Sequence, residues 1–513
     1  MNVFDSDEQL FVFDSEKWRK ACETDYSLPE GPSVTEVDNG IILPLIRKKD
    51  PSGVSPLFSG GVCDENGNFI AGHRRNLNRE PFPLHCTTAY SLTAPPTVRH
   101  ETVVYCGVLH ARFGHVLTGC LSRLWWYADH QDTEYKLVFL EIPVRGGFKL
   151  YNILEAAGIT RDRMEIITEP TKFDKVIIPE QTLYGFSGYR PGMGKIYDLI
   201  RSRTQPGPYK KVYLSTAQLT DEITEKSGVN EKYFEDFYKR RGYEVVYPER
   251  LPFSEQVSIM HGAEEVVCTN GSLVFLAMFC PQTAHVILLN RTCYLQYMGF
   301  LCLQGRGMAF CVIDAHLNFL PATHNGDCVF FYGPTVYWKR YLDKKSIAYE
   351  PEELSWDLCV KPYIYDYVLK WGINSAKPAY TAIHNMTLID IVENIHNVFL
   401  QTTINRKALP DRDDVTKLKK ENSTLNNKVN VMEGILKMAL VEYNQNHLTE
   451  MCEAVRPLGI NCSINVDNTE MQELQTNVER LENKIHGMEN SLSWRITKPL
   501  RTVKAWFKRI FNK

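Results

Sequence analysis

From about residue 101 onward, short apolar runs alternate with segments of helical periodicity. The runs at 103–108, 137–142 and 164–167 are typical of buried strands, and the segments 113–127 and 148–157 are typical of helices. Because strands and helices alternate, this pattern predicts βαβ units with parallel strands.

The alternation starts again after a Pro- and Gly-containing breaker at 204–208. Further strands are predicted at 211–215, 243–247, 264–269, 285–289 and 310–313, and helices at 231–241, 254–262 (with Ser254 as its N-cap) and 273–279. Two such series predict the α/β class, with one doubly wound lobe at 101–205 and a second at 206–345. Ligands of open α/β sheets bind beyond the carboxyl ends of the strands, so we expect the site in a cleft between the lobes.

The segments on either side of these lobes have a weaker pattern. Residues 1–100 are irregular, with recurring Pro and Gly, and Asn66-Gly67 predicts a hairpin turn. We expect 1–100 to be an N-terminal extension packed on the body, and 346–410 to be a helical strap across the lobes.

Residues 411–493 carry apolar positions at seven-residue spacing. The clearest series are Met471, Val478, Ile485 and Leu492 with Leu474, Leu481 and Met488. Such a/d spacing predicts a coiled coil, and Asn422 at an a position favours a dimer. The alternative is an antiparallel hairpin within one chain, bent near 457–459.

The last twenty residues, 494–513, contain seven basic and no acidic side chains. Basic and aromatic residues share a helical spacing that is typical of a membrane-surface helix. The residues predicted to bind the membrane are Arg501, Lys504, Trp506, Phe507, Lys508 and Arg509. A solvated helix end or a basic arm for an acidic partner is the alternative.

Composition narrows the class of protein. A net charge of -3 over 513 residues argues against a nucleic-acid partner. The 14 cysteines contain no C-x-x-C pair, which favours reduced thiols in the cytosol. With no leader-like N-terminus and no apolar run of about 18 residues, we expect a cytoplasmic protein, peripheral at the inner face of the cell membrane. No G-x-G-x-x-G follows a strand, so a dinucleotide-binding oxidoreductase is not indicated.

Two blocks of ordered motifs carry a family resemblance. The first reads Phe-Gly-His at 113–115 and Leu-Ser-Arg-Leu-Trp at 121–125. The second includes Arg-Gly-Tyr-Glu-Val-Val-Tyr-Pro-Glu at 241–249 and Asn-Gly-Ser-Leu at 270–273. In order and spacing these motifs resemble family 61 glycosyltransferases over about 100–320. The heptads followed by Ser-Trp-Arg-Ile-Thr-Lys-Pro-Leu also look like endings found on bacterial surface-polysaccharide transferases.

The resemblance implies a GT-B-like fold of two Rossmann-like lobes, the first for the acceptor and the second for a nucleotide-sugar donor. It also implies inversion at the anomeric carbon and transfer to a cell-surface polysaccharide, another glycan or a lipid-linked glycan.

The candidate donor-binding residues cluster at predicted strand ends and in the resembling motifs. In Thr269-Asn270-Gly271-Ser272, a strand passes into a helix whose backbone N–H groups could hold a diphosphate. Taken alone, such a Gly junction is more often a plain turn. The remaining candidates are Arg123, Ser215, Thr216 and Glu255, with Lys210 or Lys211 as a further cation.

No metal or other cofactor is expected. The D-x-D patterns at 5–7 and 411–413 lie away from the predicted cleft, where a metal–diphosphate clamp would be needed. The charge of the donor must then be balanced by helix N-termini and by Arg or Lys.

An inverting transfer needs a base that takes the proton of the acceptor hydroxyl. His115, in the Phe-Gly-His motif, is the first candidate, and His110, at the end of a predicted strand, is the second. A lone His on a helix is more often structural.

The sequence departs from the family pattern in three respects. Gly119 stands where many relatives carry Asp or Glu, and Thr216 stands where relatives usually carry Arg. Relatives also commonly carry a His either just before or shortly after the junction Gly, and this chain has Asn270 and Phe275 at those two places. A second class of function therefore stays open: a catalytically silent transferase-like protein that binds a nucleotide sugar or glycan, or scaffolds polysaccharide assembly.

Overall fold

The computed structural model describes residues 6–371 except 49–56, 71–74, 77–82, 86–88, 143–149, 186–187, 220–227, 293–294, 319–328, 365 and 368–369. The predicted coiled-coil segments, the basic C-terminal helix and most of the predicted strap lie outside the described residues.

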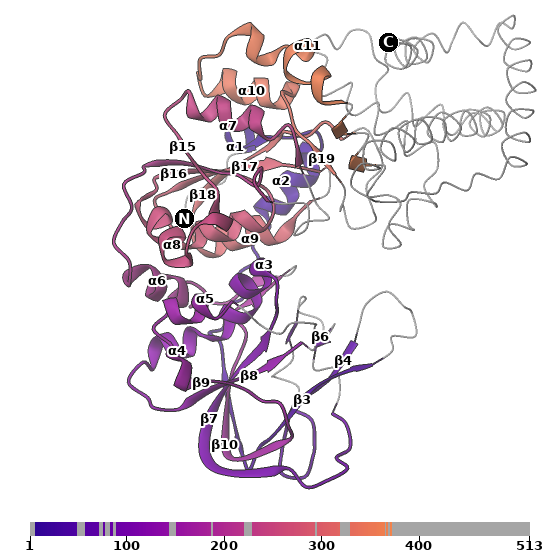
Figure 1. Ribbon diagram of the computed structural model, residues 1–513, viewed down its shortest axis with the longest axis vertical. Coiled ribbons are helices and arrows are strands. Elements are labelled where there is room, and N and C mark those ends of the chain that lie inside the picture. Colours follow the sequence, from indigo (N-terminus) through magenta and orange to yellow (C-terminus); the bar gives the residue numbers. More distant parts are fainter. Residues whose placement is uncertain are drawn as a thin grey trace, which may run out of the picture. The chain divides into compact units, whose positions relative to one another are not determined.

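A parallel sheet lies in the second half of the described chain (Figure 1). Its order is β15 (Glu244–Val246), β13 (Lys211–Leu214), β16 (Glu265–Thr269), β17 (His285–Asn290), β18 (Ala309–Asp314) and β1 (Leu10–Phe11). All neighbouring strands of this sheet run parallel. If β13 is counted as the first strand, the order of the five strands other than β1 is 2-1-3-4-5, which is a doubly wound arrangement. The predicted α/β class with parallel strands is confirmed.

Helices cover both faces of the parallel sheet. They are α7 (Lys232–Lys239), α8 (Phe253–Gly262), the 3₁₀ helix η6 (Ser272–Phe279), α9 (Tyr297–Gly305) and α10 (Val336–Lys344). Trp338 of α10 packs edge-on against Phe234 and Phe237 of α7, and α8 and α9 both contact η6. Figure 1 shows α7 and α10 on one side of the sheet and α8 and α9 on the other. Because both faces are covered, the strands are continuous apolar runs, as in Val266–Cys268, which are fully buried.

Two local predictions in this region need correction. Ser254 is not an N-cap, because α8 begins at Phe253 with Pro252 in the cap position. The segment 273–279 is a 3₁₀ helix rather than an α-helix.

A mixed sheet contains the strands of the first predicted series. Its order is β4 (Leu57–Cys63), β3 (Ile41–Lys48), β10 (Thr171–Pro179), β7 (Thr97–Leu109), β8 (Lys136–Glu141) and β9 (Met164–Ile166), with β2 (Val34–Asp38) also paired to β10. The four strands from β10 to β9 are parallel, whereas β2, β3 and β4 are antiparallel.

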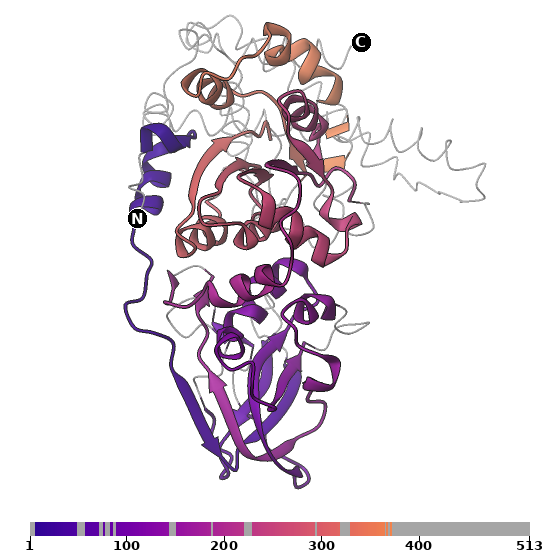
Figure 2. The same ribbon diagram turned by 90° about the vertical axis from the view of Figure 1, so that its left-hand side faces the viewer.

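The first hundred residues, for which we expect an extension packed on the body, contribute strands to both sheets. The strand β1 adds to the parallel sheet beside β18, and the helix α2 (Ser15–Glu23) packs its Trp18 against Phe300 of α9. In Figure 2, the indigo chain runs from these elements into β2 and β3 of the mixed sheet. Since β18 and β10 would otherwise expose unpaired backbone groups, these strands complete the two sheets.

The predicted helix at 113–127 is a series of short turns. They are α3 (Phe113–His115), the π-helical turn η2 (Val116–Cys120), the 3₁₀ turn η3 (Leu121–Arg123) and α4 (Trp125–Asp129). Two more helices, α5 (Tyr151–Ala156) and α6 (Lys195–Ser202), follow in this half, and both contact α8.

The remaining elements are short. They are α1 (Ser6–Gln9), the paired strands β5 (Arg75–Asn76) and β6 (Pro83–His85), β11 (Leu183–Tyr184) and β12 (Gly188–Tyr189), β14 (Gly228–Val229) and β19 (Phe330–Phe331), and the turns η4 (Arg161–Arg163), η5 (Pro248–Arg250), η7 (Pro351–Leu354), α11 (Trp356–Cys359) and η8 (Lys361–Tyr363).

Candidate functional site

The parallel sheet has one topological switch point, between β13 and β16. From β13 the chain crosses to β15 on one side, and from β16 it crosses to β17 on the other. Ser215 and Thr216 follow β13, and Asn270 and Gly271 follow β16. Ligands of doubly wound sheets bind at a switch point, beyond the carboxyl ends of the strands. The structure therefore brings four predicted donor-binding residues together at this end of the sheet.

Two buried carboxyl groups lie directly behind the end of β13. The backbone N–H of Thr216 donates to Oε1 of Glu231 at 3.0 Å, and the Thr216 hydroxyl donates to Oε2. The Ser215 hydroxyl donates to Oε1 of Glu235 at 2.6 Å, and the Tyr247 hydroxyl donates to the other oxygen at 3.1 Å. The side chain of Ser215 therefore serves the internal structure of this edge.

Glu231 is the more perturbed of these acids. Burial raises the pKa of its carboxyl to about 7, although the hydrogen bonds from Thr216 and the positive charge of Arg291 act in the opposite direction. We did not single out Glu231 from the sequence. The available signal was its place at the start of the helix predicted at 231–241.

A positive charge lies against the Gly271 junction. A Cβ added to Gly271 would lie 2.8 Å from Nη1 and 2.9 Å from Cζ of Arg291, so the guanidinium packs on the glycine backbone. Arg291 directly follows β17, the strand next to β16, and its guanidinium also lies over the ring of Phe330 at 4.4 Å. The absence of a side chain at Gly271 thus makes room for the Arg291 guanidinium at the predicted diphosphate position. The sequence alone gave Arg291 no distinguishing motif.

A buried row of polar side chains crosses the carboxyl ends of three strands. Nδ2 of Asn270 donates to Asn290 at 2.9 Å, and Nδ2 of Asn290 donates to Asp314 at 2.8 Å. The other Asp314 oxygen accepts the backbone N–H of Phe13 at 2.7 Å. The row holds Asn270 in place and connects the switch point to the N-terminal strand.

Helix α3 lies against this same edge. The ring of Phe113 contacts the ring of Phe253 at the start of α8, with centroids 6.4 Å apart. A Cβ added to Gly114 would lie 3.0 Å from Oγ of Ser272 and 3.1 Å from Phe275. The Phe-Gly-His motif of the first series therefore touches the Asn-Gly-Ser junction of the second series.

The two candidate bases are neighbours on this side of the contact. The rings of His110 and His115 have centroids 4.2 Å apart, and both side chains are half-buried. The backbone N–H of Arg112 donates to Nδ1 of His110 at 3.1 Å. Ser272, across the contact, is exposed.

Two other candidates have different surroundings. Arg123 is buried, and its guanidinium donates to the backbone carbonyl of Pro179 in the mixed sheet. Glu255 is exposed in the first turn of α8. Donor binding by these two residues stays a prediction.

The prediction that Lys210 or Lys211 supplies the donor-binding cation is wrong. Both stand at the amino end of β13, at the opposite edge of the parallel sheet from Thr216. Lys210 pairs with Glu264 at 2.9 Å, and Nζ of Lys211 lies over the ring of Tyr243 at 5.3 Å.

Within the part of the chain that the structure describes, no three His, Cys, Asp or Glu side chains are grouped so that they could hold a metal ion. In the same residues, no helix is both long and apolar enough to cross a membrane.

The fold and the site thus define a doubly wound α/β protein with an anion-compatible junction at its switch point. Residues 113–287 match the family model described as Glycosyltransferase 61. The matched segment runs from α3 into β17 and contains both sides of the contact between Gly114 and Ser272. This match supports the family 61 resemblance and glycosyltransferase activity.

Comparisons with whole proteins gave weaker likenesses. No curated protein matches the sequence. The bacterial iron-containing dodecameric glycosyltransferase TibC from enterotoxigenic E. coli H10407 is 14% identical, with 51% of this chain and 74% of that chain covered and a TM-score of 0.22. A dodecameric iron-containing heptosyltransferase TibC in complex with ADP-D-beta-D-heptose is 13% identical, with 56% and 84% covered and a TM-score of 0.24.

Proposed function

We propose that this chain is an inverting, metal-independent glycosyltransferase. It moves a hexosyl or pentosyl group from a nucleotide-sugar donor to a growing cell-surface polysaccharide or another glycan, using two GT-B-like lobes. The observation that carries the proposal is the contact of the Phe-Gly-His motif with the Asn-Gly-Ser junction, at the switch point of a parallel sheet.

In this proposal the donor diphosphate lies at the start of η6. Backbone N–H groups there and the guanidinium of Arg291 balance its charge. In the family pattern an Arg stands after the strand that corresponds to β13, and this chain has Thr216 there. Arg291 follows a different strand, β17, so the site keeps a positive charge although the Arg of the family pattern is replaced.

His115 acts as the base in this proposal. It takes the proton of the acceptor hydroxyl as the oxygen attacks the anomeric carbon, and the bond to the nucleoside diphosphate breaks. The ring of His110, beside that of His115, would position it. The absence of an acid at Gly119 is then compatible with activity.

The C-terminal segments 411–493 and 494–513 add two further parts to the proposal. The basic residues and aromatics of 494–513 bind the inner face of the cell membrane, and the heptads of 411–493 pair two chains. Support for both comes from the sequence pattern alone.

The test is a thermal-shift screen against nucleotide sugars, followed by transfer assays. A donor at 100 times its Kd should stabilise the wild-type fold by about 2.7 kcal/mol. Arg291→Ala should lose most of this shift, Arg291→Lys should keep part of it, and Arg340→Ala, on the exposed side of α10, should keep all of it. His115→Ala should keep the shift but lose turnover.

Two results would count against the proposal. Unchanged turnover in His115→Ala would remove the proposed base. If no nucleotide sugar shifted the wild-type protein, the catalytically silent alternative would replace the enzyme.

A further inference from the structure

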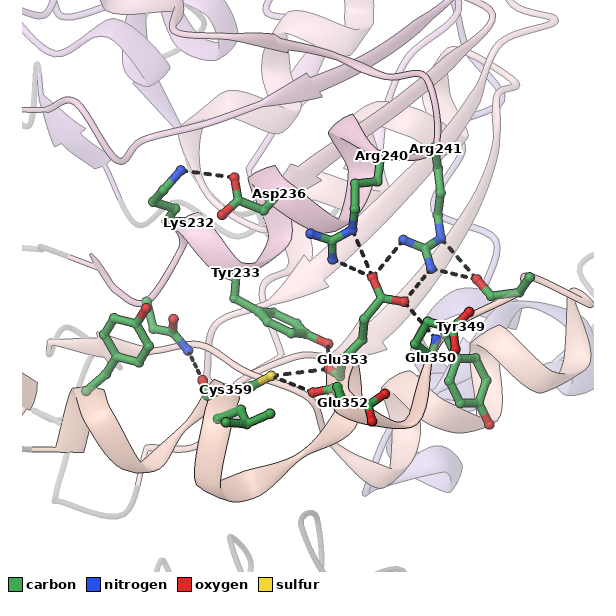
Figure 3. A pocket seen from close by; sticks show the side chains of 14 residues that line it. Lys232, Tyr233, Asp236, Arg240, Arg241, Tyr349, Glu350, Glu352, Glu353 and Cys359 are labelled. Atoms are coloured by element: carbon green, nitrogen blue, oxygen red, sulfur yellow. Dashed lines mark hydrogen bonds and ion pairs between the residues drawn. The ribbon is translucent and has the colours of Figure 1, made fainter.

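A surface pocket lies outside the residues proposed for the switch-point site. Helix α7 and the segment 348–363 enclose a surface pocket of about 750 Å³, shown in Figure 3. This volume is within the range of small-ligand sites, roughly 300–1,000 Å³. None of the residues proposed above to bind the donor or to act as base lines the pocket.

The charges of the pocket largely neutralise one another. Its lining contains three basic and four acidic side chains. Lys232 pairs with Asp236 at 2.9 Å, and Arg240 and Arg241 both pair with the carboxylate of Glu353, as Figure 3 shows. Because the cations already have carboxylate partners, the pocket does not favour a phosphate or another strongly charged ligand.

The rest of the lining is aromatic and apolar. Tyr233, Tyr349 and Tyr363 contribute to the wall, and Leu358 is 61% exposed at its rim. Aromatic rings provide flat apolar surface, and the paired carboxylates and guanidinium groups can still exchange hydrogen bonds with hydroxyls. This combination suits a ligand with apolar C–H faces and many hydroxyl groups.

The pocket walls are fixed to each other. Nδ2 of Asn230, which precedes α7, donates to the carbonyl of Cys359 at 2.7 Å and to that of Tyr332 at 3.0 Å. The Tyr233 hydroxyl donates to the carbonyl of Glu353 at 2.8 Å. A preformed pocket of this kind loses little conformational entropy when a ligand binds.

We propose that this pocket binds a neutral segment of a glycan chain, separately from the site at the switch point. Sugar hydroxyls donate and accept hydrogen bonds, so they can bridge the ion pairs without needing a countercharge. The choice of a glycan rests on the proposed function, because the acceptor of a glycosyltransferase is a glycan. The two residues before α7 link the two sites, since Asn230 lines the pocket and the adjacent Glu231 holds Thr216.

Saturation-transfer NMR with the full chain tests this inference. The probes are maltohexaose, cellohexaose, mannohexaose and N-acetylchitohexaose. At least one should receive saturation from the wild type and from Tyr135→Ala, an exposed tyrosine outside the pocket. Glu352→Ala and Tyr363→Ala should each weaken binding about fivefold, which corresponds to the loss of one ordinary contact.

Failure of all four probes, or unchanged binding by both pocket variants with wild-type melting curves, would overturn the inference. A saturating mixture of UDP, GDP, CDP and ADP distinguishes the two sites. The glycan signal should persist in the mixture, and displacement would place the glycan at the switch point instead. If glycan binding is retained by a protein that binds no nucleotide, the proposed function fails while this inference stands.

Discussion

The buried carboxyl group of Glu231 holds the backbone after β13, but its burial disfavours the ionised form. Its carboxylate accepts both hydrogen bonds of Thr216 and so fixes the turn after β13. The ionised form is nevertheless poorly solvated, which is why burial raises its pKa to about 7 from an unfolded value of about 4.5. Its folded state therefore holds a proton more tightly than its unfolded state.

The pH dependence of stability follows from this difference. The contribution of the protonated carboxyl is fully present below pH 4.5 and is lost as pH rises through about 7. From pH 5 to pH 8, the free energy of unfolding of the wild type should fall with a slope that includes up to one bound proton from Glu231. Glu231→Gln should lack this contribution, as measured by urea unfolding across the same pH range. Glu244→Gln, on the exposed face of β15, should keep the wild-type profile. Parallel profiles for the wild type and Glu231→Gln would contradict this account.

At the scale of elements, the two-residue strand β1 is held in the sheet by Asp314, which is distant from it in the sequence. Strand β1 pairs with β18 through Leu10 and Phe11, and Asp314 at the end of β18 accepts the N–H of Phe13. A strand this short has little stability of its own. Its place in the sheet therefore depends on side-chain contacts.

Asp314→Ala should loosen this N-terminal segment. The substitution leaves the N–H of Phe13 and the amide of Asn290 without their acceptor, which costs about 1–3 kcal/mol. Limited chymotrypsin digestion should then cleave at Phe11 or Phe13 faster than in the wild type. Asp343→Ala serves as the control, because its pair with Lys339 is on the surface. Equal cleavage of the two variants would show that Asp314 does not hold β1.

At the scale of the whole described molecule, the two series of elements are joined by specific contacts. Arg306, at the end of α9, donates to both carboxylate oxygens of Asp198 in α6, at 2.9 and 2.7 Å, and its own side chain is 1% exposed. The breaker at 204–208 between the two series is also packed, since a Cβ on Gly262 of α8 would lie 2.1 Å from the carbonyl oxygen of Gly207.

Arg306→Ala should therefore destabilise the described fold by about 1–3 kcal/mol, less than for a fully buried pair because Asp198 is 43% exposed. A double-mutant cycle with Asp198→Ala, followed by chemical unfolding, should give a coupling energy above about 0.5 kcal/mol. Additive effects of the two substitutions would mean that this ion pair does not join the two series.

The central strands of the parallel sheet were predictable from the local pattern of apolar residues. The runs predicted at 264–269 and 285–289 are β16 and β17 to within a residue, because strands covered on both faces need nearly every residue to be apolar. The same local signal placed Thr269, Asn270, Gly271 and Ser272 at a strand-to-helix junction. The helix α9 was missed, because its buried residues leave little amphipathic period to detect.

The segments that complete the sheets and the site come from distant parts of the chain, and the three-dimensional fold was needed to identify them. The register of Leu10 with Val312 spans some three hundred residues, and no local pattern encodes such a pairing. Arg291 reaches Gly271 because β17 lies beside β16, whereas Lys211 is removed from the site because it stands at the other end of β13. Periodicity reports what each element buries, but the chemistry of this site depends on which strand ends meet.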